Sequence, residues 1–72
     1  MAEQIREALK ILRRKQLEAR LGLSRSTIYA MVAANELPPP IRLGNGRAVG
    51  WIEGEIDAWL AAQVERSRRD AA

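Results

Sequence analysis

The stretch of sequence that decides the fold runs from residue 15 to residue 35 and reads KQLEARLGLSRSTIYAMVAAN. Its first seven residues favour a short helix with leucines on one face, and Gly22 follows as a C-terminal stop. Ser24 is a favourable N-cap and predicts a second helix from Arg25 to Asn35. Because only three residues separate the two helices, the pattern predicts a helix-turn-helix.

A β-hairpin is predicted after this unit. Pro38-Pro39-Pro40 end helical structure and force an extended path. Two strand-like runs follow, at residues 41–43 and 48–51, with Gly44-Asn45-Gly46-Arg47 between them. Asn-Gly supplies the positive φ angles of a tight turn, and Gly50 weakens the second strand and is a candidate bulge. Four apolar residues are expected to alternate onto one face of the hairpin: Ile41, Leu43, Val49 and Trp51.

The C-terminal segment, from about Glu53 to Arg69, predicts the longest helix. Acidic residues crowd its first turns and arginines its last, which matches the helix dipole; the alternative is that these arginines form a basic tail on DNA. Its apolar residues recur at helical spacing and form one stripe: Ile52, Ile56, Trp59, Leu60 and Val64.

The segment before the helix-turn-helix has two interpretations. Residues 4–12 carry a helical stripe, or they form a tail that ends in a short extended piece at Ile11-Leu12-Arg13. The elements together predict a mainly α fold with a small β-hairpin, a compact winged helix-turn-helix domain at residues 12–64. Residues 1–11 would be an N-terminal tail or short helix, and residues 65–72 a basic C-terminal tail.

Composition favours a binding module over an enzyme. The chain has 72 residues, of which 47% are hydrophobic and 29% charged, so it supports one domain with a small core. It contains no cysteine and no histidine, which removes disulfides, thiolate metal sites and the usual nucleophile pairs. We therefore expect no metal and no cofactor. With no apolar run of membrane length and no signal peptide, the sequence predicts a cytoplasmic, nucleoid-associated protein.

The charge is divided unevenly along the chain. The net charge is +3, but residues 1–47 carry nine basic and four acidic groups, whereas residues 48–72 carry three basic and five acidic groups. Clustered positive charge is typical of proteins that bind polyanions, although it also serves solubility. The basic half contains the helix-turn-helix, so double-stranded DNA is the expected partner.

The second helix divides into an inward face of Ile28, Met31 and Val32 and an outward face that is small, polar and cationic. A cation in the first turn opposes the helix dipole, so Arg25 points to an anionic partner, and on DNA its guanidinium can contact either guanine or phosphate. Ser24 and Thr27 also have capping interpretations, and the ring of Tyr29 could cover the core. The predicted DNA-binding residues are Lys15, Ser24, Arg25, Ser26, Thr27, Tyr29, Arg42, Asn45 and Arg47.

Several motifs together resemble those of the AlpA family of prophage regulatory proteins. They are residues 12–29, Leu37-Pro38, residues 41–44, Val49-Gly50-Trp51 and residues 55–60. The resemblance covers roughly residues 12–64. It implies an excisionase-like winged-helix fold related to MerR-type DNA-binding domains, and a role in transcriptional control or excision of mobile DNA.

Two other hypotheses remain open at this point. An interaction adaptor would keep the fold and use the helix that carries Trp59 to dock a protein partner. An enzyme has the weakest support, because no paired acid and base and no phosphate loop are present. Since one small module offers limited contact area on DNA, we also expect homodimers or cooperative binding to repeated sites.

Overall fold

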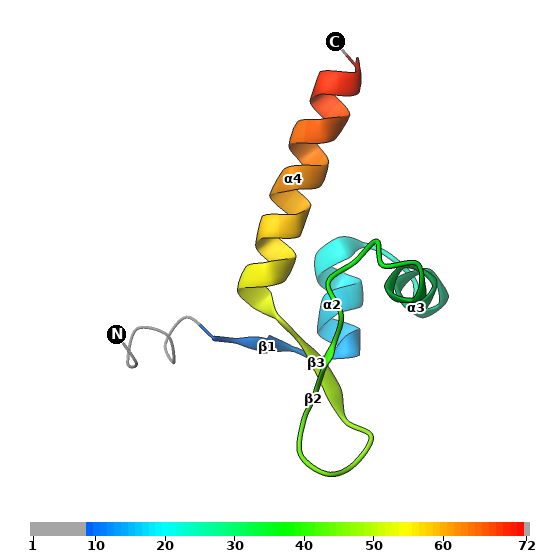
Figure 1. Ribbon diagram of the computed structural model, residues 1–72, viewed down its shortest axis with the longest axis vertical. Helices are drawn as coiled ribbons and strands as arrows, with labels where there is room; N and C mark the ends of the chain where they lie inside the picture. The colour runs from blue at the N-terminus through cyan, green and yellow to red at the C-terminus, as the bar shows by residue number, and fades with distance from the viewer. Residues whose placement is uncertain (1–8, 72) are drawn as a thin grey trace.

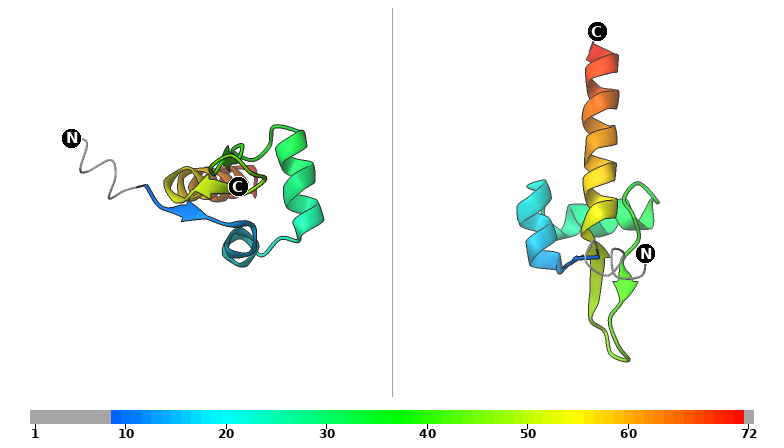
Figure 2. Two further views of the ribbon diagram at one scale, coloured as in Figure 1. Left: turned by 90° about the horizontal axis from the view of Figure 1, so that it is seen from below. Right: turned by 90° about the vertical axis from the view of Figure 1, so that its left-hand side faces the viewer.

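The computed structural model describes residues 9–71, which form three helices and three short strands around one core (Figure 1). The elements in chain order are β1 (Ile11–Leu12), α2 (Arg14–Leu21), α3 (Arg25–Ala33), β2 (Ile41–Arg42), β3 (Val49–Ile52) and α4 (Glu53–Ala71). The β2–β3 hairpin and the far end of α4 extend in opposite directions from the core (Figures 1 and 2). This arrangement confirms a compact, mainly helical winged helix-turn-helix fold with a small sheet.

The turn between α2 and α3 is closed by the residues expected there. Gly22 adopts a left-handed φ of 68°, and its N–H donates to the Glu18 carbonyl at 2.7 Å. At the start of α3, the Ser24 hydroxyl oxygen accepts a hydrogen bond from the Thr27 N–H at 3.3 Å. The helix-turn-helix prediction is therefore confirmed in both its C-terminal stop and its N-cap.

The end of α3 differs from the prediction. The helix ends at Ala33, two residues before the predicted Asn35. Asn35 takes a left-handed φ of 59°, and the N–H groups of Asn35 and Glu36 donate to carbonyls of the last helical turn at 3.1 and 2.8 Å. Asparagine here occupies the position that glycine often takes in such an ending. The turn brings Leu37 into the core, where it is buried.

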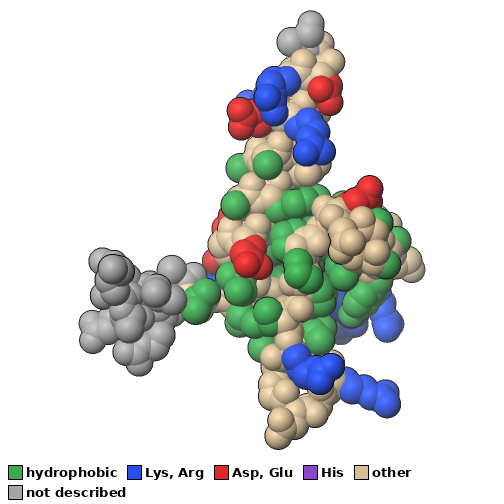
Figure 3. All heavy atoms as spheres, viewed as in Figure 1, with side chains coloured by type: hydrophobic (Ala, Val, Ile, Leu, Met, Phe, Trp, Pro, Cys, Tyr) green, Lys and Arg blue, Asp and Glu red, His purple; other side chains and the backbone are tan. Residues whose placement is uncertain are grey.

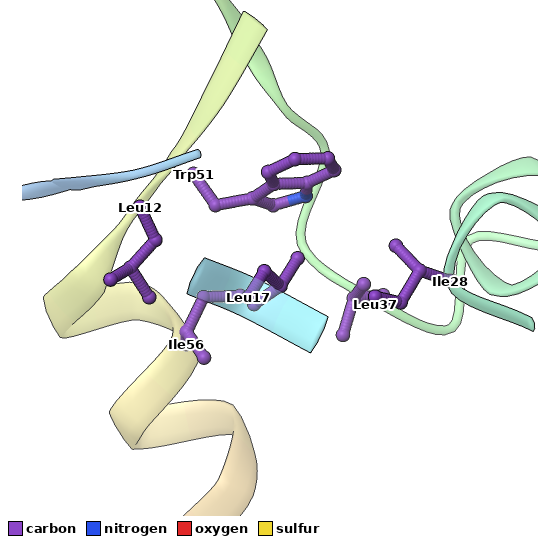
Figure 4. Packing of buried hydrophobic residues seen from close by; sticks show 6 residues of the cluster. All are labelled: Leu12, Leu17, Ile28, Leu37, Trp51 and Ile56. Carbon is purple, nitrogen blue, oxygen red and sulfur yellow. The ribbon is translucent and has the colours of Figure 1, made fainter. Parts of the chain in front are cut away.

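The core takes one buried residue from almost every element. Its members are Leu12, Leu17, Ile28, Leu37, Trp51 and Ile56 (Figure 4). Leu17 lies in the middle of the cluster beneath the indole of Trp51, and both are fully buried. The Trp51 indole N–H is also buried and has no hydrogen-bond partner among the residues that the structure describes. Apolar packing therefore holds this side chain in place.

The sheet has β3 as its central strand, paired antiparallel with β1 on one side and β2 on the other. Ile41 pairs with Gly50, and directly paired residues point to the same face. Val49 and Trp51 flank Gly50 along β3 and therefore point to the other face. The expectation that Ile41 and Leu43 share a face with Val49 and Trp51 is wrong, because this register places the two pairs on opposite sides.

Gly50 allows β1 to come close to β3. The pairing continues regularly through this glycine, so it does not form a bulge. A Cβ atom at this position would overlap Ile11 Cγ2 and would lie 3.3 Å from the Leu12 carbonyl oxygen. The short strand Ile11–Leu12 confirms the extended alternative for this segment; residues 4–8, for which a helix was the other expectation, lie outside the described residues.

The hairpin is confirmed, but its turn is not the predicted one. The Leu43 N–H donates to the Ala48 carbonyl at 2.8 Å and closes a four-residue loop, 44–47. Gly44 has the positive φ angle, 78°, whereas Asn45 and Gly46 do not. The expectation that Asn45-Gly46 supplies the positive φ angles of the turn is therefore wrong, because the four-residue loop reverses the chain with Gly44 as its left-handed residue.

Helix α4 follows β3 directly, without a loop. The Glu53 N–H, at the start of the helix, donates to the Lys10 carbonyl at 2.7 Å, which satisfies one backbone donor that a helix start leaves free. Arg20 of α2 forms ion pairs with Glu53 and Asp57, each at 2.7 Å. The hydrogen bond to Glu53, followed by the charge of Asp57, raises the pKa of Arg20 above its usual value. These contacts join the first turns of α4 to α2.

The second half of α4 projects away from the core (Figure 1). The helix has 19 residues and so spans about 28 Å. Ile56 is buried, Trp59 and Leu60 are half-buried, and Val64 is 42% exposed. The predicted apolar stripe is thus confirmed up to Leu60 and wrong at Val64, because the helix has by then left the core. Within residues 9–71, no helix has the length and apolar character needed to cross a membrane.

Candidate nucleic-acid interface

Helix α3 divides its side chains between core and solvent as the sequence predicts. Ile28 is fully buried, and Met31 and Val32 are half-buried against the core cluster. The opposite flank is exposed; it consists of Arg25, Ser26, Tyr29 and Ala33. An exposed, cationic helix face of this kind fits the major groove of B-DNA.

The hydroxyl groups at the start of α3 have capping roles in the structure. The Ser24 hydroxyl donates to Thr27 Oγ1 at 3.0 Å and accepts the hydrogen bond from the Thr27 N–H. The structural interpretation of both residues is therefore confirmed. Because Thr27 Oγ1 is an acceptor in this pair, its own proton remains available to a further acceptor, such as a phosphate oxygen. Ser26 lies beside them and is exposed.

Two of the outward side chains of α3 lie against each other. The Arg25 guanidinium carbon is 5.9 Å from the centre of the Tyr29 ring, within the range of a cation–π contact. The Tyr29 ring in turn lies 6.5 Å from that of Trp51, tilted by 57°. Tyr29 thus covers the rim of the core while remaining 39% exposed, and it supports Arg25 at the surface.

A cleft of about 360 Å³ opens between the start of α2, helix α3 and the hairpin. Each of these three segments contributes side chains to its wall. The lining residues are Arg13, Arg14, Lys15, Tyr29, Arg47, Ala48 and Val49. All the charged residues in this lining are basic. The helix-turn-helix and the wing therefore face a common, positively charged opening.

The cleft brings together three of the nine predicted DNA-binding residues, namely Lys15, Tyr29 and Arg47. Four others stand at the start of α3: Ser24, Arg25, Ser26 and Thr27. Arg42 and Asn45 are exposed on the wing and do not line the cleft. Arg42 lies on strand β2 directly opposite Val49, so its side chain shares the face of the sheet that borders the cleft.

Sequence reasoning missed Arg13 and Arg14 as site residues. Arg14 forms an i,i+4 ion pair with Glu18. Arg13 is the N-cap residue of α2, and its Nε–H donates to the Val49 carbonyl of the wing at 3.0 Å. A signal was present: Arg14 and Lys15 occupy the first turn of α2, where cations oppose the helix dipole. The argument that singled out Arg25 on α3 applies equally to this run.

Basic side chains gather near the base of the wing and beside it, and a second group of mixed sign covers the projecting part of α4 (Figure 3). The first turns of α2 and α3 contain no acidic residue, whereas that of α4 contains Glu53 and Glu55. The two helices that border the cleft therefore have positive charge at their positive ends. Such an arrangement is unfavourable within the chain and becomes favourable when an anion binds.

The environment of Trp59 bears on the adaptor hypothesis. Its indole N–H donates to the Glu36 carbonyl at 2.7 Å, and the side chain is half-buried against the core cluster. It also forms part of a groove between the end of α3 and α4, together with Met31 and Arg66. Trp59 thus fixes α4 to the turn after α3, which is a structural role.

Comparisons with known proteins identify one family and two relatives. A family model described as "Prophage CP4-57 regulatory protein (AlpA)" matches residues 10–64. "Uncharacterized protein ORF88" of Enterobacteria phage P4 is 44% identical over 48 residues, which are 67% of this chain and 53% of that protein. "DNA-binding transcriptional activator AlpA" of Escherichia coli (strain K12) is 36% identical over 65 residues, which are 83% of this chain and 93% of that protein. The chain thus spans about half the length of the phage protein and most of the bacterial one. No solved structure matches the chain.

Proposed function

The chain belongs to the AlpA family of prophage regulatory proteins, which confirms the resemblance seen in its sequence, and from this premise we propose that it is a sequence-specific double-stranded DNA-binding protein. In this proposal it regulates transcription from a phage or mobile element, or acts as an excisionase-like factor. Helix α3 enters the major groove, and the β2–β3 wing lies on the adjacent backbone or minor groove. Its place of action is the cytoplasm, on the nucleoid.

One observation carries the proposal: the exposed flank of α3 and the wing border the same basic cleft. Tyr29 of α3 and Arg47 of the wing both line it. A duplex that approaches this opening meets both elements at once, and every charged group in the lining attracts phosphate. A flank buried in the core, or a wing that faced away from α3, would not support DNA binding.

The specific contacts are assigned by position. We propose that Arg25 and Ser26 read base edges or flanking phosphates, and that Thr27 donates to phosphate. Arg42, Asn45 and Arg47 are assigned to the backbone beside the wing, and Lys15 to the backbone at the cleft. The contact of Arg25 with the Tyr29 ring supports its role, since a guanidinium that already packs on a ring loses less conformational freedom on binding.

Selection of binding sites from a pool of random duplexes tests the proposal. We expect a defined site to be enriched, and its affinity to fall linearly with the logarithm of salt concentration, at about −0.9 per phosphate contacted. The substitution Arg25→Ala should weaken binding by about 1–3 kcal/mol and relax the preference at one base pair. A pool that stays random, or binding that does not change with salt, would contradict the proposal.

Charge reversal separates DNA binding from a role as a protein adaptor. Arg25→Glu combined with Arg47→Glu changes two exposed side chains, and we expect it to abolish binding to the selected duplex. Arg66→Glu with Arg69→Glu makes the same change on the projecting end of α4 and serves as the control. Circular dichroism would verify that both variants fold. Equal binding by the two double variants would contradict the assignment of the interface.

We also propose that the protein binds DNA as a homodimer or cooperatively on repeated sites. A single small module buries limited area on DNA and supports only modest affinity. Footprinting of the selected site tests this, because cooperative assembly protects adjacent repeats over the same narrow range of protein concentration. Protection of one repeat alone at saturating protein would contradict it.

A further inference from the structure

The basic cleft has a wall made from three separate parts of the chain. Arg13, Arg14 and Lys15 come from the start of α2, Tyr29 from α3, and Arg47 from the wing. The volume of about 360 Å³ is that of roughly a dozen waters at about 30 Å³ each. It is large enough for a small, hydrated anionic group. Ala48 and Val49 are the aliphatic residues of this lining.

The positive charge of this cleft is only partly compensated within the chain. Glu18 forms an ion pair with Arg14 and compensates its positive charge. Lys15 and Arg47 are exposed, and neither forms an ion pair with any residue between 9 and 71. Arg13 uses its Nε–H to bind the Val49 carbonyl, but a guanidinium has four further N–H groups. Three cations therefore face one opening with hydrogen-bond donors to spare.

We propose that this cleft holds one phosphodiester group of the DNA backbone, the one that lies between the groove entered by α3 and the position of the wing. The proposal rests on the proposed function and deepens it. When a helix lies in the major groove and a hairpin lies beside the adjacent minor groove, one sugar-phosphate strand separates them. The cleft lies between the corresponding two elements of this protein, α3 and the wing.

Each lining residue has a distinct part in this contact. Lys15 supplies a mobile point charge, whereas Arg13, held by the wing carbonyl, presents its remaining N–H groups from a fixed position. Arg47 closes the cleft from the wing. The Tyr29 hydroxyl can donate to a phosphate oxygen while its ring stays on the core and beneath Arg25. The contact carries charge but reads no base, so it should position the protein without specifying sequence.

The test compares Lys15→Gln and Arg47→Gln with Arg68→Gln, a matched loss of one charge on the last turn of α4. The probes are the selected duplex and a mixed-sequence duplex of about 20 base pairs, two helical turns. We expect each cleft substitution to reduce the slope of log affinity against log salt by about 1 and to weaken binding to both probes by the same factor. The Arg68→Gln control should leave the slope unchanged.

A neutral methylphosphonate placed at single backbone positions of the selected duplex identifies the phosphate. One position should weaken binding by the wild-type protein and weaken binding by Arg47→Gln by a smaller factor, because this substitution already removes part of the same contact. Cleft variants whose slopes equal that of Arg68→Gln, while the wild type binds with normal salt dependence, would overturn this inference and leave DNA binding by α3 intact. A wild-type protein that binds neither probe would overturn the proposed function itself.

Discussion

At the scale of the residue, Gly50 is the position where the close pairing of β1 and β3 depends on the absence of a side chain. In Gly50→Ala the new methyl group would overlap the Ile11 side chain and approach the Leu12 carbonyl to 3.3 Å, so this side chain and the β1 backbone beside it would have to shift. We expect a loss of about 1–3 kcal/mol in the free energy of unfolding. Urea denaturation followed by Trp fluorescence measures it.

Gly54→Ala is the matched control for this substitution. Gly54 lies in the first turn of α4, and a Cβ atom there meets nothing within 4 Å. Alanine favours the helix over glycine, so the control should gain about 0.5–1 kcal/mol. Two variants with the same sign of change would contradict the packing described for Gly50.

At the scale of the element, one side-chain hydrogen bond among residues 9–71 joins the wing to the helix-turn-helix, between Arg13 and the Val49 carbonyl. Arg13→Lys keeps the positive charge but removes the Nε–H that makes this contact. We expect the backbone amides of the hairpin, in particular that of Leu43, to exchange with solvent faster in this variant. Hydrogen exchange followed by nuclear magnetic resonance measures the effect.

The core amides of Leu17 and Ile28 are the internal reference for that experiment. Both residues are fully buried, and their N–H groups donate to the backbone carbonyls of Arg13 and Ser24, which the substitution leaves in place. Their exchange rates should stay the same in Arg13→Lys. Uniform acceleration throughout the chain would indicate general destabilisation and contradict a local role for Arg13 in holding the wing.

Most elements could be predicted because their signals are local. Gly22 and Ser24 mark the ends of helices through their own backbone and side-chain chemistry, and the structure confirms both. Two predictions were wrong in detail: that α3 extends to Asn35, and that Asn45-Gly46, not Gly44, supplies the positive φ angle of the turn. Which residue becomes left-handed depends on the length of the loop around it. Local pattern identifies which residues can adopt such a conformation but not which one does.

The sheet register could not be read from the sequence of the hairpin alone. Alternation predicted a single apolar face, but the pairing of Ile41 with Gly50 places it on the face opposite Trp51. β1 determines part of this arrangement, since Ile11 lies over the glycine and comes from a distant part of the chain. The cleft could not be predicted from local sequence either, because Arg13 and Arg47 line the same cleft only after the wing has folded beside α2.

At the scale of the whole molecule, the protein has a basic end and an opposite end formed by the projecting half of α4 (Figures 1 and 3). The predicted DNA-binding residues lie on α2, α3 and the wing, all at the basic end or beside it. The limits of the domain at residues 12 and 64 stay a prediction. The helical residues after 64 extend α4 beyond the core.

The direct passage from β3 into α4 has a consequence for assembly. No loop separates β3 from α4, and Arg20 of α2 forms ion pairs with the first turns of α4. The direction of α4 relative to the sheet is therefore fixed. Because this orientation is fixed, two copies on neighbouring sites would contact each other in the same way only when both stand on the same side of the duplex. Cooperativity should thus be strong at a spacing of about 10.5 base pairs, vanish when half a turn is inserted, and return after a full turn. Band-shift titrations on tandem sites with different spacings measure this dependence on helical phase. Cooperativity that stayed the same at every spacing would indicate coupling through the DNA or through a flexible protein contact instead.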